Sequence, residues 1–246
     1  MRSSGRRLAE VAAMLRETVC EGITTADLDA MAEDKIRSMG AIPAFKGYAP
    51  DGGTPFPSTI CASPNEQVVH GIPTNVPLRD GDIISIDMGL HHGGYFADMA
   101  FTVPIGKPSE EVQSLLDVTR QSLYIGIAAA QAGRRIGDIG HAIESSIKPH
   151  DLGIVRQYVG HGIGRALHER PSVPNYGKPN TGDLIKPGMC LALEPMVTLG
   201  TWRTKTLKDK WTVVTADGTL AAHFEHTIAI TPTGTELLTV LEGETS

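Results

Sequence analysis

The chain has 246 residues, of which 41% are hydrophobic and 20% charged, so it can bury a sizeable core. Its formal net charge of -6 argues against a dedicated nucleic-acid-binding protein, which is usually basic. No stretch approaches the roughly 18 apolar residues that a membrane span needs. Three distant cysteines without a CxxC pair argue against a disulfide framework and against a thiolate zinc site. We therefore expect a cytoplasmic monomer that has no membrane or nucleic-acid partner.

Two helices are predicted at the start of the chain. Apolar residues recur at helical spacing over residues 3–20, which is unlike a signal peptide. Thr24 and Asp27 then have the spacing of a capping box, which predicts a second helix that runs to about Met39. A glycine- and proline-rich loop, APDGGTPFP, follows at residues 49–57.

The rest of the chain is predicted to alternate between strands and helices. Residues 82–90 and 95–103 have the pattern of a hairpin. Later helices are predicted at residues 109–131 and 136–147. Further strands are predicted at residues 68–69, 154–159, 189–198, 211–215 and 220–231.

A weak internal repeat suggests how the chain is organised. Two helices followed by strands occur twice, and Asp27 with Glu33 in the first half echoes Asp138 with Glu144 in the second. No linker divides the halves. We therefore expect one α/β (α+β) domain over residues 1–246, with halves of about 1–104 and 105–246.

The predicted hairpin carries two acids that call for an explanation. If its turn is His92-Gly93, Asp87 and Asp98 face each other on strands rich in Ile, Phe and Val. A solvated strand face would explain either acid alone. Opposed buried carboxylates repel each other, so the pair indicates a bound cation or a shared proton.

Later strands supply further candidate metal ligands. Glu194 lies in an apolar run and Glu225 in an alternating strand, although a distant basic side chain could pair with either. His161 lies in a GHGIG stretch whose glycines allow close approach of a ligand. Arg165 and Leu167 stand where a dinucleotide-binding GxGxxG motif needs glycine. Four carboxylates and one imidazole suit a site for two divalent ions, Co, Mn, Fe or Zn, which would activate a water and polarise a carbonyl.

Two more histidines lie in distinctive stretches. His70 is in VHGIP and His168 is in LHERP, and a neutral imidazole can donate a hydrogen bond to a developing oxyanion. A structural or surface role is the ordinary explanation for a lone histidine. The sequence has no GxSxG or HExxH motif, so serine-hydrolase and zincin activities have no support.

At these residues the sequence resembles the bacterial type I methionine aminopeptidases of the M24 metallopeptidases. The matching stretches keep their order along almost the whole chain: GITTADLD, NEQVVHGIP, DGDIISIDMG, GYFADMAFT, GHGIGRALHERPSVPNYG, LEPM and HFEHT. The resemblance implies a pita-bread fold, a pseudo-two-fold arrangement with an antiparallel sheet flanked by helices. It also implies removal of the N-terminal methionine from nascent proteins that have a small second residue, and an association with the ribosome.

The resemblance further implies a role for each candidate residue. Asp98 and Glu225 would bridge two metal ions, Asp87 would complete one site, and His161 with Glu194 would complete the other. Glu194 would also handle the proton of the attacking water. His168 and His70 would both act in catalysis and substrate binding: His168 would stabilise the tetrahedral intermediate, and His70 would contact the peptide. The methionine side chain would enter a pocket formed by Tyr48, Phe45, Cys61 and Trp211.

Two departures from the family pattern concern this pocket. The family usually has a shorter link between the Gly-Tyr and Pro-Ser-x-Cys stretches, which are separated here by residues 49–56. We expect this link to be mobile or reshaped. Leu167 also precedes His168 where many members have an aromatic residue, which predicts a softer pocket edge.

Three alternatives remain open. An Xaa-Pro aminopeptidase or dipeptidase would share the fold and the metals, but those relatives usually carry a large additional N-terminal domain. A non-catalytic pita-bread binding protein would typically lack some metal ligands. A structural α/β protein with scattered acids would bind no divalent metal.

Overall fold

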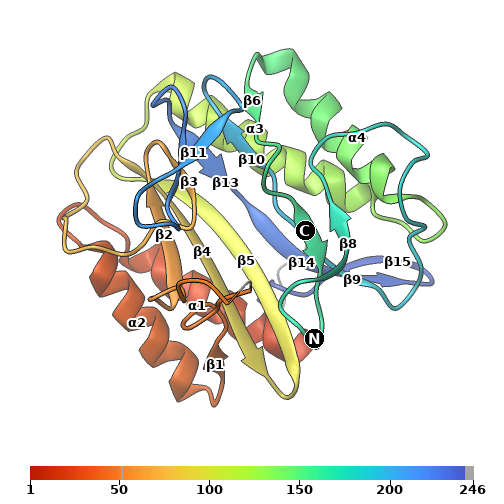
Figure 1. Ribbon diagram of the computed structural model, residues 1–246, viewed down its shortest axis with the longest axis horizontal. Helices are drawn as coiled ribbons and strands as arrows, with labels where there is room; N and C mark the ends of the chain where they lie inside the picture. The colour runs from red at the N-terminus through yellow and green to blue at the C-terminus, as the bar shows by residue number, and fades with distance from the viewer. Residues whose placement is uncertain (51, 242–246) are drawn as a thin grey trace.

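Two pairs of helices flank the sheet of the computed structural model, which describes residues 1–50 and 52–241. Helices α1 (Arg2–Thr18) and α2 (Thr25–Ser38) lie along one side of the long hairpin, and α3 (Glu110–Ala129) and α4 (Ile136–Ile147) lie on its other side (Figure 1). The four predicted helices are confirmed, and each begins and ends within two residues of its predicted bounds. A short 3-10 helix, η1 (Lys148–His150), follows α4. None of the described helices has the length and apolarity required to cross a membrane.

The capping box predicted at Thr24 is present. The backbone N–H of Asp27 donates to the Thr24 hydroxyl over 3.1 Å, and the Thr24 N–H donates to the Asp27 carboxylate over 3.1 Å. Asp138 likewise accepts from the N–H of Arg135 over 2.8 Å at the start of α4. The two helices therefore share the half of the capping box in which an acid at the third position accepts the N-cap N–H, whereas only α2 has an N-cap side chain that accepts in return. The division of the chain into two similar halves remains a prediction.

The central sheet is antiparallel and has nine strands among the described residues. Its main path runs β1-β4-β5-β14-β9-β7-β8, while β2 pairs with β4 and β15 pairs with β14. These strands are β1 (Ile42–Pro43), β2 (Ile60–Pro64), β4 (Ile83–His92), β5 (Tyr95–Pro104), β7 (Gly160–Gly162), β8 (Glu169–Val173), β9 (Cys190–Leu193), β14 (Glu225–Thr231) and β15 (Gly234–Leu237). The main hydrophobic core lies between this sheet and the helices, with Leu8, Ile86 and Ile139 among its fully buried members.

Two three-stranded sheets complete the fold. One has the order β13 (Ala221–His223), β10 (Met196–Thr198) and β6 (Gly153–Ile154). The other has the order β11 (Thr204–Thr206), β12 (Val213–Thr215) and β3 (Gln67–Val69). All strand pairs in the three sheets are antiparallel.

The predicted register of the β4–β5 hairpin is wrong by two residues. The turn is Gly93-Gly94, with φ of 58° and 84°, so Asp87 faces Ala100 and Asp98 faces Gly89. A tight hairpin turn with positive φ at both central positions favours two glycines over His92-Gly93. A shift of two residues preserves the face of the sheet, so the two carboxylates are diagonal neighbours on one face.

Two predicted long strands are each divided in two. The predicted strand at 189–198 becomes β9 and β10, separated by Glu194 and Pro195. The predicted strand at 220–231 becomes β13 and β14, separated by Phe224, so His223 and Glu225 belong to different sheets. The N–H of Phe224 donates to the carbonyl of Pro195 over 3.4 Å, so the two breaks lie side by side. The strand predicted at 154–159 is reduced to β6, which ends at Ile154.

Candidate active site

Five buried polar residues from different strands line one cavity of about 400 Å³. Because β4, β5, β14, β9 and β7 are consecutive neighbours in the central sheet, side chains far apart in sequence meet on one face. The five are Asp87 on β4, Asp98 on β5, His161 on β7, Glu194 directly after β9 and Glu225 on β14. The structure thus brings together all the candidate metal ligands.

Short distances define the centre of this cluster. One ligand atom each from Asp98, His161 and Glu225 lies within 4.8 Å of the others. The Nε2 atom of His161 is 3.6 Å from Oε1 of Glu194 and 3.9 Å from Oδ2 of Asp98. These separations leave room for a cation between the side chains.

The electrostatics of the cluster is unfavourable without positive charge. Burial raises the pKa of Asp87 to about 7, while the thiol of Cys61 opposes this by hydrogen bonding to the carboxylate. Burial, followed by repulsion from the neighbouring carboxylates, raises the pKa of Asp98, Glu194 and Glu225 well above their ordinary values. Four buried carboxylates therefore cannot all be ionised together unless a cation compensates them.

His161 is oriented as a metal ligand. Its Nδ1 lies 2.9 Å from the carbonyl of Gly162, which can only accept, so Nδ1 carries the proton. The unprotonated Nε2 then faces the carboxylates, and burial lowers the pKa of His161 to about 4, which keeps the ring neutral. Among the buried side-chain atoms described, Oδ1 of Asp87, Oδ1 of Asp98 and Oε1 of Glu225 lack a hydrogen-bond partner. This donor set fits a divalent cation.

The apolar wall of the same cavity contains all four predicted pocket residues. Phe45, Tyr48, Cys61 and Trp211 line it together with Pro50, Phe56, Val69 and Leu167. Cys61 lies on β2, which pairs with β4, and it faces Asp87 directly across the two strands. The apolar wall and the acidic cluster therefore share one cavity.

Phe56 is the pocket residue that the sequence analysis missed. It is 2% exposed, and its ring packs edge-on against Trp211 with the ring centres 5.2 Å apart. The Trp211 indole N–H also donates to the carbonyl of Thr54 over 3.1 Å. The signal available in the sequence was a large aromatic residue inside a glycine- and proline-rich loop. The last residues of this loop fold against Trp211.

The two additional histidines line the same cavity as the cluster. His70 adopts a left-handed backbone conformation with φ of 59° and packs edge-on against Trp211, with ring centres 5.9 Å apart. Its pKa is lowered to about 4, first by burial and then by His168. The His168 ring centre is 4.3 Å from that of His161, and its Nδ1 is 2.6 Å from the hydroxyl of Tyr48.

Comparisons with known proteins identify the family of the chain. The chain is 50% identical over 239 residues to methionine aminopeptidase 1 of Bacillus subtilis, covering 97% of this chain and 94% of that protein. It is 49% identical over 243 residues to the methionine aminopeptidase of Clostridium acetobutylicum, covering 98% and 95%. The predicted resemblance to methionine aminopeptidases is thereby confirmed.

Solved structures confirm the predicted fold class. The crystal structure of methionine aminopeptidase from Thermotoga maritima matches with a TM-score of 0.93 and 41% identity, over 98% of this chain and 95% of that chain. Prolidase from Pyrococcus furiosus, at 21% identity, shares the fold with a TM-score of 0.77, over 98% of this chain and 64% of its own. The family model of metallopeptidase family M24 matches residues 1–232. The chain therefore belongs to metallopeptidase family M24.

Proposed function

We propose that the chain is a methionine aminopeptidase that removes the N-terminal methionine from nascent proteins and favours a small second residue. The observation that carries the proposal is the single cavity in which a buried acidic cluster meets an apolar wall. The wall suits an unbranched apolar side chain, and the cluster suits hydrolysis of the peptide bond next to it. Two relatives that are about half identical to this chain are named methionine aminopeptidases, which supports the same activity.

Two divalent ions, Co, Mn, Fe or Zn, would be held by the cluster. Asp98 and Glu225 would hold both ions, Asp87 would hold one of them, and His161 with Glu194 would hold the other. When bound, the ions lower the pKa of a water and polarise the scissile carbonyl. Four carboxylates balance the charge of two divalent ions, and this balance supports the number proposed.

The protein side chains would supply the remaining steps. Glu194 accepts the proton of the attacking water and delivers it to the leaving amine. His168 stabilises the oxyanion of the tetrahedral intermediate, and His70 contacts the substrate peptide near the scissile bond. The Tyr48 hydroxyl lies 2.6 Å from Nδ1 of His168, and by donating to it the hydroxyl would leave the His168 proton on Nε2, available to the substrate.

The methionine side chain would enter the pocket of Phe45, Tyr48, Cys61 and Trp211, with Phe56 as an added wall. A thioether is flexible and polarisable, and it packs well against aromatic edges such as Phe56 and Trp211. We also propose a monomeric, cytoplasmic enzyme that meets its substrates at the ribosome, where nascent N-termini emerge.

An Xaa-Pro aminopeptidase or dipeptidase is the second candidate, because prolidases have the same fold. Hydrolysis of Met-Ala-Ser and Ala-Pro-Ala, with and without added Mn(II) or Co(II), distinguishes the two. We expect metal-dependent release of methionine from the first peptide only. Release of alanine from the second peptide alone would overturn the proposal. Hydrolysis of neither peptide by protein that contains metal would favour the non-catalytic binding protein.

A further inference from the structure

The pocket wall is built on two stems that enclose the long link. Phe45 and Tyr48 precede the link, and Phe56 and Cys61 end or follow it. Between the stems, described residues such as Thr54 and Pro55 are exposed. The ends of the link are joined directly, because the Gly47 N–H donates to the Phe56 carbonyl over 2.8 Å and the Phe56 N–H donates to the Tyr48 carbonyl over 2.9 Å. These two bonds set the distance between the stems, whereas the position of the paired stems against the rest of the fold needs contacts from other elements.

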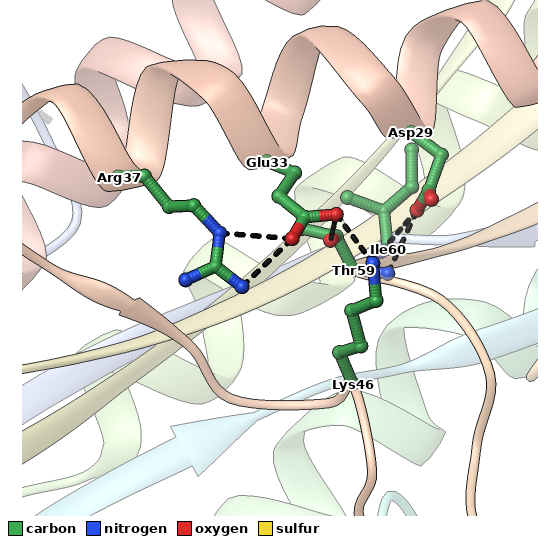
Figure 2. A network of polar contacts seen from close by, with 6 residues as sticks. All are labelled: Asp29, Glu33, Arg37, Lys46, Thr59 and Ile60. Carbon is green, nitrogen blue, oxygen red and sulfur yellow. Dashed lines mark hydrogen bonds and ion pairs between the residues drawn. The ribbon is translucent and has the colours of Figure 1, made fainter.

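Helix α2 contacts the first stem through Glu33 (Figure 2). The ammonium group of Lys46, which lies between Phe45 and Tyr48 in sequence, donates to Oε2 of Glu33 over 2.6 Å. The hydroxyl of Thr59, on the second stem, donates to the same oxygen over 3.3 Å. One carboxylate oxygen therefore joins both stems to the helix.

The second stem has a further attachment one turn earlier on α2. Oδ1 of Asp29 accepts the backbone N–H groups of Thr59 and Ile60 over 2.8 and 2.9 Å. Figure 2 shows Asp29 and Glu33 on the same face of the helix, both directed at the start of β2. Cys61, the next residue, faces Asp87 across the sheet, so this attachment continues directly into the cluster.

Arg37 provides a contrast within the same network. Its guanidinium lies 2.7 Å from Oε1 of Glu33, so it binds the carboxylate from within α2. Within the part of the chain that the structure describes, its side chain makes no hydrogen bond or ion pair with either stem. Hydrogen bonds from Lys46 and Arg37 lower the pKa of Glu33, which remains ionised. Lys46 and Arg37 thus make ion pairs of 2.6 and 2.7 Å with one partner, but only Lys46 belongs to a stem of the pocket.

We propose that Asp29, Glu33 and Lys46 are positioning residues for the methionine pocket, because they fix its two paired stems against helix α2. The inference rests on the proposed function of the pocket. Stems held in this position keep the pocket narrow enough to reject branched side chains. It also holds Tyr48, two residues after Lys46, against His168.

Selectivity between Met-Ala-Ser and Leu-Ala-Ser tests the proposal, measured as the ratio of their kcat/KM values. We expect Lys46→Met to lower this ratio about three- to five-fold, the range that a half-exposed ion pair can supply. Lys46→Arg should restore it, and Arg37→Met should leave it unchanged. Bound metal per chain should be the same in all variants. An unchanged ratio in Lys46→Met, or equal losses in Lys46→Met and Arg37→Met, would overturn the inference.

Two further variants separate failure of this inference from failure of the pocket assignment. Asp29→Ala should lower the ratio at least as much as Lys46→Met, because it removes two hydrogen bonds to the second stem. Phe45→Ala enlarges the pocket directly and should also lower the ratio. If Phe45→Ala changes the ratio but the α2 variants do not, the pocket assignment is correct and the positioning role is wrong. If none of them changes it, the pocket assignment itself fails.

Discussion

The acidic cluster and the pocket wall share one cavity but are supported by different kinds of structure. Four of the five cluster residues lie on strands of the central sheet, where ladder hydrogen bonds fix the backbone, and the fifth, Glu194, directly follows β9. The wall lies on an irregular link and its stems, held by side chains of α2 and by Trp211. We infer that the sheet determines whether the enzyme reacts, whereas the link determines which substrate it accepts.

The largest effect should come from the cluster. Asp98→Ala or Glu225→Ala removes a side chain proposed to hold both metal ions, and we expect kcat/KM for Met-Ala-Ser to fall more than about 10³-fold. Loss of one oxyanion donor alone costs about 10²- to 10³-fold, and a lost metal centre should cost more. Metal content, measured by elemental analysis, should fall as well.

A surface acid provides the control for this experiment. Asp117 is half exposed and paired with Arg120 on α3, so Asp117→Ala should leave metal content and turnover unchanged. Turnover near that of the unaltered protein in either cluster variant would contradict the two-metal site.

The sequence predicted the cluster better than the wall, and the two supports explain why. A carboxylate in an apolar strand is conspicuous, and period-two alternation places it on a definite face. The hairpin prediction failed only in register, because the turn is formed by Gly93-Gly94. The resulting shift of two residues left Asp87 and Asp98 on one face of the sheet. An error of one residue would have moved one of them to the opposite face.

The wall depends on contacts that have no periodicity. Phe56 is held in the wall by the ring of Trp211, more than 150 positions later, and by backbone hydrogen bonds with Gly47 and Tyr48. Glu33 corresponds to Glu144 in the weak internal repeat, but nothing in the sequence pairs Glu33 with Lys46 and Thr59. The breaks at Glu194-Pro195 and Phe224 were hidden in the same way, because each depends on the other strand.

An intermediate effect is expected where the wall and the cluster meet. His168→Ala should lower kcat about 10²- to 10³-fold while metal content stays unchanged, because its proposed role is stabilisation of the oxyanion. The exposed His141 on α4 serves as control, and His141→Ala should have no effect on kcat. Collapse of metal occupancy in His168→Ala would instead place this histidine in the metal site.

The smallest effect tests whether the wall adjusts the chemistry as well as the choice of substrate. Tyr48→Phe keeps the ring but removes the hydroxyl that lies 2.6 Å from Nδ1 of His168. A neutral hydrogen bond contributes about 1 kcal/mol, so we expect kcat to fall about five-fold with little change in KM.

Tyr124→Phe is the matched control, because its hydroxyl lies 3.4 Å from the Nε2 of His226, outside the cavity. It should leave both constants unchanged. If Tyr48→Phe raised KM and left kcat intact, the hydroxyl would serve only to shape the pocket. A fall in kcat would mean that the first stem, held by the Lys46–Glu33 ion pair, orients His168 through the Tyr48 hydroxyl. The same contacts with α2 would then affect both selectivity and turnover.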